Sequence, residues 1–166
     1  EVKEGNAYLL NDSLYITGTG EVSLLAAQVG NEQYLPADTV EIVFEVDKAS
    51  QVITFDAIAD KTYGDEPFEL SASASSGLEV VFEALSSNIS VTGDTVIING
   101  GGEAEIRAYQ TGNDNYHPSD TARQQFTVNQ AVQTISMDAI DDKQVDDDPF
   151  KLNASASSGL PLDFEV

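Results

Sequence analysis

The chain has 166 residues, and 29 Asp and Glu against 7 Lys and Arg give a formal net charge of −22. This charge excludes a basic nucleic-acid binder and opposes contact with anionic membranes. The chain has no cysteine, which excludes disulfides, thiolate nucleophiles and cysteine-based zinc sites. The apolar fraction of 41% is enough for a packed core, so the acidic residues are expected on a solvated surface.

No apolar run approaches the roughly 18 residues of a membrane helix, so direct membrane insertion is not expected. The first four residues, Glu-Val-Lys-Glu, do not open a signal peptide. Export is therefore expected to depend on sequence outside this segment.

An internal repeat with an offset of 82 residues organises the chain. Residues 51–84 return as residues 133–166, with 20 of 34 positions identical. The same offset relates Gly-Asn-x-x-Tyr-x-Pro at 30–36 to its copy at 112–118. The repeat predicts the C-terminal half of one unit at 1–50, a complete unit at 51–132 and the N-terminal half of another at 133–166.

Alternating apolar and polar residues predict strands in the complete unit. We expect no helix, because no window has a convincing 3.6-residue apolar period. The seven predicted strands cover residues 52–55, 68–74, 80–82, 89–91, 95–98, 103–109 and 124–128.

Seven short strands in such a unit predict an all-β fold of tandem immunoglobulin-like β-sandwiches. An odd number of strands brings the chain in at one pole of a sandwich and out at the other, so that units follow one another end to end. The six residues 129–134 between two units contain neither Gly nor Pro. This short link predicts a semi-rigid rod.

The recurring residues resemble a known family. They are Gln-x-Ile-x-Phe-Asp-Ala-Ile-Ala-Asp-Lys-Thr-Tyr-Gly-Asp-x-Pro-Phe at 51–68, then Ser-Ser-Gly-Leu, Ser-Ser-Asn, and Gly-Asn-x-x-Tyr. This pattern is similar to the MBG-type repeats, bacterial immunoglobulin-like modules of large secreted surface proteins and gliding adhesins. The second copy departs from it, because Thr-Tyr-Gly at 62–64 becomes Gln-Val-Asp at 144–146. The resemblance implies extracellular display in tandem at the bacterial cell surface, without catalysis.

Few residues suit a catalytic site, and we expect no enzyme. The only histidine, His117, aligns with Leu35, so the repeat does not require an imidazole there. Glu103 and Glu105 are interpreted as solvated residues of a strand, although paired carboxylates also serve glycosidases. The glycines at 100–102 predict a turn, because a phosphate-binding loop would continue into Lys-Ser/Thr and a helix.

Acidic residues near the second unit boundary offer oxygen ligands for calcium. No EF-hand spacing accompanies them, and we favour the alternative that they keep a long array soluble. Calcium therefore stays a candidate for a bound ion at these residues. The candidate ligands are Asp138, Asp141, Asp142, Asp146, Asp147 and Asp148.

Four tripeptides resemble the Asp-Ser/Thr-aliphatic signal for O-glycosylation in Bacteroidota-type bacteria. The alternative is that Asp closes a turn and a β-branched residue opens the next strand. The candidate acceptors are Ser13, Thr39, Thr95 and Thr121.

Other recurring residues suggest structural roles. We expect the tyrosines to fill the loop before the last strand, the glycines to allow a tight turn, and the phenylalanines to lie in the core. These residues are Tyr34, Tyr116, Gly77, Gly159, Phe44, Phe68, Phe82 and Phe126.

These observations favour a structural repeat in an adhesin stalk or surface filament, with neighbouring repeats as its partners. One alternative is a carbohydrate-binding module that contacts surface glycans through pole loops such as 112–118. The absence of tryptophan argues against it. Another is a filament subunit in which 133–166 of one molecule complete 1–50 of the next by strand complementation.

Overall fold

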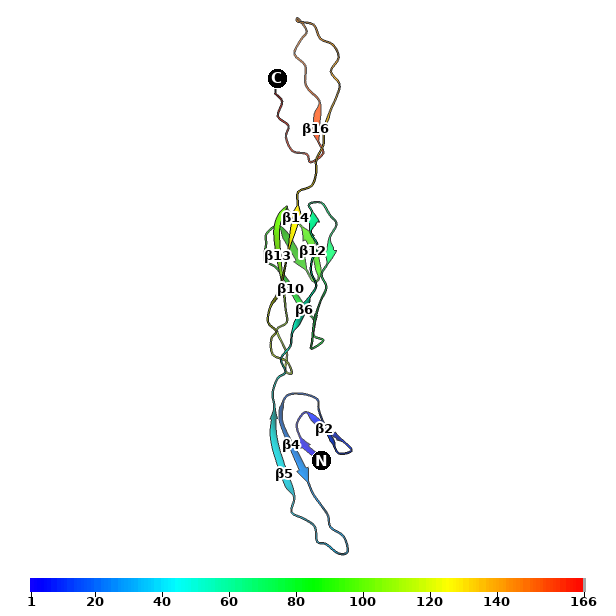
Figure 1. Ribbon diagram of the computed structural model, residues 1–166, viewed down its shortest axis with the longest axis vertical. Coiled ribbons are helices and arrows are strands. Elements are labelled where there is room, and N and C mark those ends of the chain that lie inside the picture. Colours follow the sequence, from blue (N-terminus) through cyan, green and yellow to red (C-terminus); the bar gives the residue numbers. More distant parts are fainter. Residues whose placement is uncertain (166) are drawn as a thin grey trace.

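The computed structural model describes residues 1–165, which form strands but no helix. Three parts follow one another along the long axis of the molecule (Figure 1). We name them the N-terminal part (1–50), the central unit (51–132) and the C-terminal part (133–165). The prediction of an all-β fold is confirmed. No helix suited to crossing a membrane occurs among the described residues.

The central unit is built of two layers of strands. One layer is a four-stranded sheet in the order β10-β13-β14-β7, and the other combines the sheet β11-β12-β8 with the pair β6-β9. The bounds are β6 (Ile53–Phe55), β7 (Lys61–Thr62), β8 (Phe68–Glu69), β9 (Ala72–Ala74), β10 (Val81–Ala84), β11 (Ile89–Thr92), β12 (Thr95–Ile98), β13 (Gly102–Tyr109) and β14 (Ala122–Asn129).

Each of the seven predicted strands overlaps an observed one, but two details differ. The segment 68–74, predicted as one strand, pairs with β12 through Glu69 and with β6 through Ala72. It therefore joins the two sheets of its layer. The short strand β7 was not predicted, because two residues in an acidic loop carry no alternation. It lies parallel to β14.

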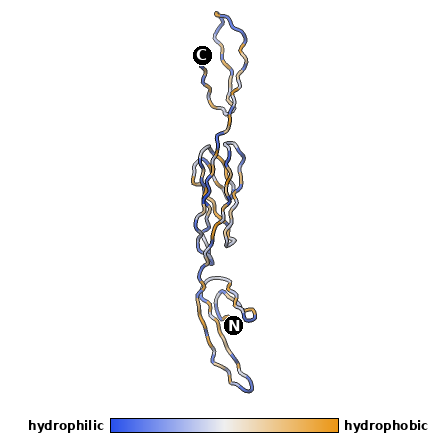
Figure 2. The backbone as a smooth tube through the Cα atoms, viewed as in Figure 1, coloured by the Kyte–Doolittle hydropathy of each residue, from blue (hydrophilic) through white to orange (hydrophobic). Residues whose placement is uncertain are grey.

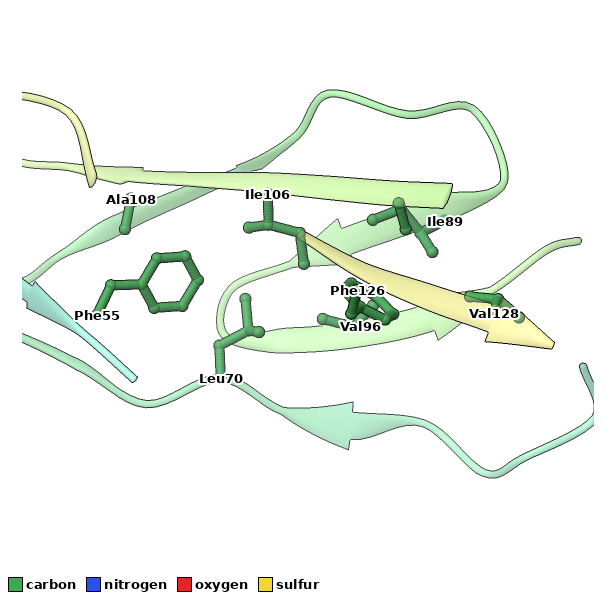
Figure 3. Close-up of a cluster of buried hydrophobic side chains, with 9 residues drawn as sticks. Phe55, Leu70, Ile89, Val96, Ile106, Ala108, Phe126 and Val128 are labelled. Carbon is green, nitrogen blue, oxygen red and sulfur yellow. The ribbon is translucent and has the colours of Figure 1, made fainter. Parts of the chain in front are cut away.

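The hydrophobic core lies between the two layers (Figure 3). It forms because alternate residues of each strand face inward, so that in β13 Ala104, Ile106 and Ala108 are all buried. Phe126 is 4% exposed, as expected for a core residue. Phe68 and Phe82 are only partly buried and pack against the edge of the cluster. The layers thus make a sandwich with a closed core.

The N-terminal part has one three-stranded sheet, β1-β4-β5, and one hairpin, β2-β3. The C-terminal part has only the antiparallel pair β15-β16. The bounds are β1 (Val2–Glu4), β2 (Ala7–Leu10), β3 (Ser13–Ile16), β4 (Gly20–Ala26), β5 (Val40–Val46), β15 (Ile135–Met137) and β16 (Ala154–Ala156).

These strands correspond to those of the central unit. Adding 82 to the bounds of β2 and β3 gives those of β11 and β12, and subtracting 82 from β15 and β16 gives β6 and β9. The register is also kept, since Gly20 faces Val46 as Gly102 faces Val128. The N-terminal part therefore has counterparts of β10–β14, and the C-terminal part has counterparts of β6 and β9.

Candidate functional site: a joint between two parts of the chain

The linker between the N-terminal part and the central unit pairs with a loop of that unit. The Ala49 N–H donates to the Asn115 carbonyl at 2.9 Å, and the His117 N–H donates to the Ala49 carbonyl at 2.9 Å. Ala49 and Tyr116 thereby form a parallel β-bridge. The linker is held like a short strand and is not a free tether.

Gln51 anchors the end of the linker. Its side chain is buried at 5% exposure, and its Nε2 donates to the His117 carbonyl at 2.7 Å and to Gln110 Oε1 at 3.2 Å. Its Oε1 accepts a hydrogen bond of 2.6 Å from the Ser76 hydroxyl. Because the buried amide has partners on both sides, it fixes where the linker enters the central unit.

The turn between β3 and β4 contacts the same loop. The Thr19 N–H donates to Asn115 Oδ1 at 3.1 Å, and the Thr19 hydroxyl donates to the Asp114 carbonyl at 2.8 Å. Lys48 Nζ donates to the Asn113 carbonyl at 2.7 Å. With the two linker bonds, five hydrogen bonds therefore join the N-terminal part to the loop. We call this arrangement the joint.

The conformation of the loop 112–118 is fixed by hydrogen bonds and a glycine within the loop itself. Gly112 has a φ of +79°, and a Cβ there would lie 2.4 Å from the Tyr116 carbonyl oxygen, so only glycine fits. Asn113 Oδ1 accepts the N–H groups of Asn115 at 2.9 Å and Tyr116 at 3.0 Å. A loop held by its own hydrogen bonds loses little entropy when another segment binds it.

The joint explains why His117 can be replaced by Leu35 in the other copy. Only the backbone of His117 takes part, through its N–H and its carbonyl, while the residue is exposed. The residues of the joint themselves were not identified from the sequence. Gln51 carried a signal, because it recurs as Gln133, whereas Thr19 and Lys48 become Gly101 and Gln130.

The six aspartates proposed for calcium are exposed, and the structure does not gather them. No group of three or more His, Cys, Asp or Glu suited to a metal occurs among residues 1–165. Asp147 instead closes a turn, with Oδ2 accepting the Gln144 N–H at 2.9 Å. Asp60, the counterpart of Asp142, accepts the Thr127 N–H at 2.8 Å. Acidic residues of the repeat thus bind backbone N–H groups.

The four candidate glycosylation residues lie where loops pass into strands. Ser13 and Thr95 are the first residues of β3 and β12, and Thr39 and Thr121 directly precede β5 and β14. Thr95 is half-buried, and its hydroxyl is 3.3 Å from Asp94 Oδ1. The other three are exposed. Their modification stays a prediction.

The structural residues differ between the copies. Gly77 and Gly159 have φ angles of +75° and +71°, as their turns require. Tyr116 is half-buried, but Tyr34 is 74% exposed and does not fill its loop. This loop has the same internal hydrogen bonds as its copy but no linker packed on it, so the tyrosine is not needed to shape it.

Phe44 is half-buried and not a closed-core residue. Its counterpart is the buried Phe126, at a distance of 82 residues. The N-terminal part lacks the strands that correspond to β6 and β9, so nothing covers this ring in the way that the second layer covers Phe126.

Glu41 accepts two side-chain hydrogen bonds in the sheet of the N-terminal part. The Ser23 hydroxyl donates to it at 2.6 Å and Lys3 Nζ at 3.0 Å. These hydrogen bonds, that of Ser23 first, and the charge of Lys3 lower the pKa of Glu41 from its ordinary value of 4.5. The three residues tie β1, β4 and β5 together.

Two features bear on the carbohydrate alternative. The loop 112–118 is engaged by the joint, so in this copy its backbone groups are not free for a sugar. A groove of about 780 Å³ lies beside β9 and β10 and is lined partly by Leu70, Ser73 and Phe82. Phe82 is tilted against Phe55 in the core, with ring centroids 5.5 Å apart. The aromatic residue of this groove is therefore partly covered by its contact with the core.

No protein-family model matches this chain, and no curated protein matches it. The resemblance to MBG-type repeats stays a prediction.

Proposed function

We propose that the chain is a non-catalytic structural segment of a long extracellular bacterial adhesin stalk or surface filament. In this proposal it is a semi-rigid, acidic spacer made of immunoglobulin-like repeats, each joined to the next at its poles. The observation that carries the proposal is the joint, because it couples two successive units by paired backbone as well as by side chains.

The strand order of the central unit supports the immunoglobulin-like assignment. In such sandwiches the first, second, fifth and fourth strands form one sheet, and the third, sixth and seventh form the other. The layer with β6, β9, β12 and β11 has the first arrangement. The layer β10-β13-β14 has the second, with β7 added at its edge.

The joint supports stiffness along the rod. Each neutral hydrogen bond contributes about 0.5–1.5 kcal/mol. Two of the five lie in a backbone bridge, which resists rotation of the linker. The formal charge of −22 supports the spacer role, since like-charged segments repel one another over about 8 Å at physiological salt.

The test is the distribution of distances across the joint. The chain has no cysteine, so spin labels can be placed at Glu21→Cys and Ser90→Cys, with Glu66→Cys and Ser90→Cys as a pair inside the central unit. Double electron–electron resonance should give a narrow distribution of spin–spin distances for both pairs of labels. Thr19→Val with Lys48→Met should broaden the first pair only, because it removes two side-chain bonds of the joint.

The matched control is Thr121→Val with Lys151→Met, which makes the same chemical changes at exposed positions away from the joint. It should leave both distributions narrow. A broad distribution across the joint in the unmodified chain would contradict the semi-rigid spacer.

A second candidate function is a filament subunit that assembles by strand complementation. The observation that favours it is the exposure of apolar strand residues in the two terminal parts, as the structure describes them. Ile135 is 68% exposed, whereas its counterpart Ile53 is half-buried. Met137 is 48% exposed, whereas its counterpart Phe55 is 8% exposed. The two ends cannot meet within one molecule, because the central unit separates them (Figure 1).

The registers of the central unit specify the contacts of such an assembly. Lys151 would face Ser13, as Glu69 faces Thr95. Asp142 would accept the Glu45 N–H of another copy, as Asp60 accepts that of Thr127. Head-to-tail pairing of this kind is heterologous and produces open filaments. Sedimentation velocity of the whole chain should show species that grow with concentration, and a monomer at all concentrations would exclude it.

A further inference from the structure

One edge of β9 in the central unit has no strand beside it. The other edge pairs with β6, and at its start the Ser71 carbonyl accepts a hydrogen bond of 3.0 Å from the Asp56 N–H. Because the backbone groups of successive residues point to opposite edges of a strand, the N–H groups of Ala72 and Ala74 point away from β6. Among residues 1–165, no hydrogen bond satisfies these two N–H groups.

The strand β12, which continues this layer beside β8, ends before it reaches Ala72. Its pairing extends only to Leu70, whose N–H donates to the Asp94 carbonyl at 2.8 Å. There the chain turns back at Gly93, which has a φ of +63°. In Figure 1, β6 accordingly lies nearer the joint than β12 does. The open edge of β9 therefore lies beyond the end of the hairpin β11-β12.

The groove of about 780 Å³ lies beside this open edge. Ala72 and Ala74 line one wall, Val80 and Phe82 line the opposite wall, and the turn at Gly93 also contributes. Val80 and Phe82 are only partly buried against the core, so the second wall offers apolar surface. The volume lies within the range of roughly 300–1,000 Å³ that is usual for ligand sites. The groove thus combines unpaired backbone groups with an apolar wall.

The same edge and groove recur in the C-terminal part. The Asn153 carbonyl accepts the Asp138 N–H at 3.0 Å, as the Ser71 carbonyl accepts that of Asp56. Both β9 and β16 read Ala-Ser-Ala, without the charge or proline that commonly blocks an open edge. The segment itself therefore determines the two walls of the groove. In the C-terminal part a groove of about 330 Å³ is lined in part by Leu152, Ala154, Ala156, Leu162 and Phe164.

Carboxylates stand at the groove of the central unit without a cation beside them. Glu79 and Asp94 line the groove and are exposed, and no ion pair of the described residues includes either. The lining of the groove contains neither Lys nor Arg. The formal charge of −22 adds an attractive field for cations. The groove is therefore complementary to a basic ligand.

We propose that this groove binds an extended, basic peptide segment of a partner protein. The peptide lies along β9 as an additional strand, and its carbonyl groups accept the N–H groups of Ala72 and Ala74. Its alternate side chains are apolar and cover the wall formed by β10, while lysine or arginine residues lie near Glu79 and Asp94. None of these residues takes part in the five hydrogen bonds of the joint, so this binding does not depend on the spacer function.

The test uses the whole chain and the peptide acetyl-Lys-Val-Thr-Val-Thr-Lys-amide, whose residues favour an extended strand. In a nuclear magnetic resonance titration, the amide signals of Ala72 and Ala74 should shift saturably at peptide concentrations below about 1 mM. The absence of saturable shifts would overturn the proposal. Shifts that follow the protein concentration alone would assign the groove to a second copy of the chain, and shifts with cellohexaose instead of the peptide would assign it to a carbohydrate. Either result would also overturn the proposal.

Backbone methylation of the peptide tests strand pairing. One variant peptide has methyl groups on the backbone nitrogens of both valines, and another has them on those of both threonines. Because alternate N–H groups face opposite edges of a strand, one variant should bind about fivefold more weakly or worse, and the other should keep most of its affinity. Equal affinity for all three peptides would exclude strand pairing and overturn the proposal.

Charge substitutions in the protein test the preference for a basic peptide. Glu79→Gln with Asp94→Asn should weaken binding roughly three- to tenfold, because both carboxylates of the groove are lost. The matched control is Glu66→Gln with Asp120→Asn, which makes the same chemical changes at exposed positions outside the groove. It should change the affinity less than about twofold. Equal weakening by the two double variants would overturn recognition of the basic residues at the groove.

Discussion

The central unit and the terminal parts have the same sequence pattern but differ in burial. Hydrophobic and hydrophilic residues are interspersed along the chain in all three parts (Figure 2). Yet Phe126 is 4% exposed in the central unit, while its counterpart Phe44 is only half-buried. The difference shows that alternation is sufficient for local strand pairing, whereas burial needs a second layer opposite each strand.

The two ends of the central unit differ in the same way. At one end, five hydrogen bonds tie the linker and the turn of Thr19 to the loop 112–118. At the other end, the described residues 51–129 and 133–165 share none. The second linker has no joint among the described residues, because the counterpart of the loop 112–118 would lie 82 residues further along, beyond residue 165.

The largest expected effect is on the free energy of unfolding. It distinguishes the closed core of the central unit from the uncovered sheet of the N-terminal part. Phe126→Ala should lower the free energy of unfolding of the central unit by about 3–5 kcal/mol, because it leaves a cavity in a packed core. Phe44→Ala should change that free energy by less than about 0.5 kcal/mol, because it lies in another part. Urea unfolding, monitored by the nuclear magnetic resonance signals of the central unit, measures both changes in the free energy of unfolding. Equal losses of stability from the two substitutions would mean that the two parts unfold together.

A smaller effect concerns the open apolar surface of the C-terminal part. Met137→Asp should weaken self-association of the chain at least tenfold, because a carboxylate would have to be buried where Phe55 lies in the central unit. Val145→Asp is the matched control, since Val145 is fully exposed and its counterpart Tyr63 is 52% exposed in the closed unit. Sedimentation velocity measures the change, and similar behaviour of the two variants would contradict burial of Met137.

The smallest effect concerns Glu41. Its lowered pKa means that the folded N-terminal part gains stability from the charged carboxylate above the ordinary value of 4.5 and loses it as the pH falls through the folded pKa. Glu41→Gln should therefore increase hydrogen exchange of β5 slightly at neutral pH, and the difference from the unmodified chain should vanish in acid.

Asp38→Asn is the control for net charge, because Asp38 is exposed and has no hydrogen-bond partner among the described residues. It should leave exchange of β5 unchanged at both pH values. A difference between Glu41→Gln and the unmodified chain that persisted at low pH would show that the pKa of Glu41 does not control it.

Much of the fold was predictable from local signals. The alternation in 103–109 and 124–128 predicted β13 and β14, and the glycines at 77 and 159 predicted their turns. The joint was not predictable, because each of its five bonds uses a backbone donor or acceptor that any residue can provide. The pairing of the segment 68–74 with two different strands was likewise missed, because alternation does not specify partners.

The sequence by itself determined most strands of the central unit, the 82-residue recurrence in the chain and the acidic surface, because each follows from residue type and local spacing. Only the tertiary structure decided which apolar residues are buried and which loop holds the linker. Both depend on contacts between segments far apart in the chain, such as Thr19 with Asp114 and Phe55 with Phe82, and local preference contains no information about those distances.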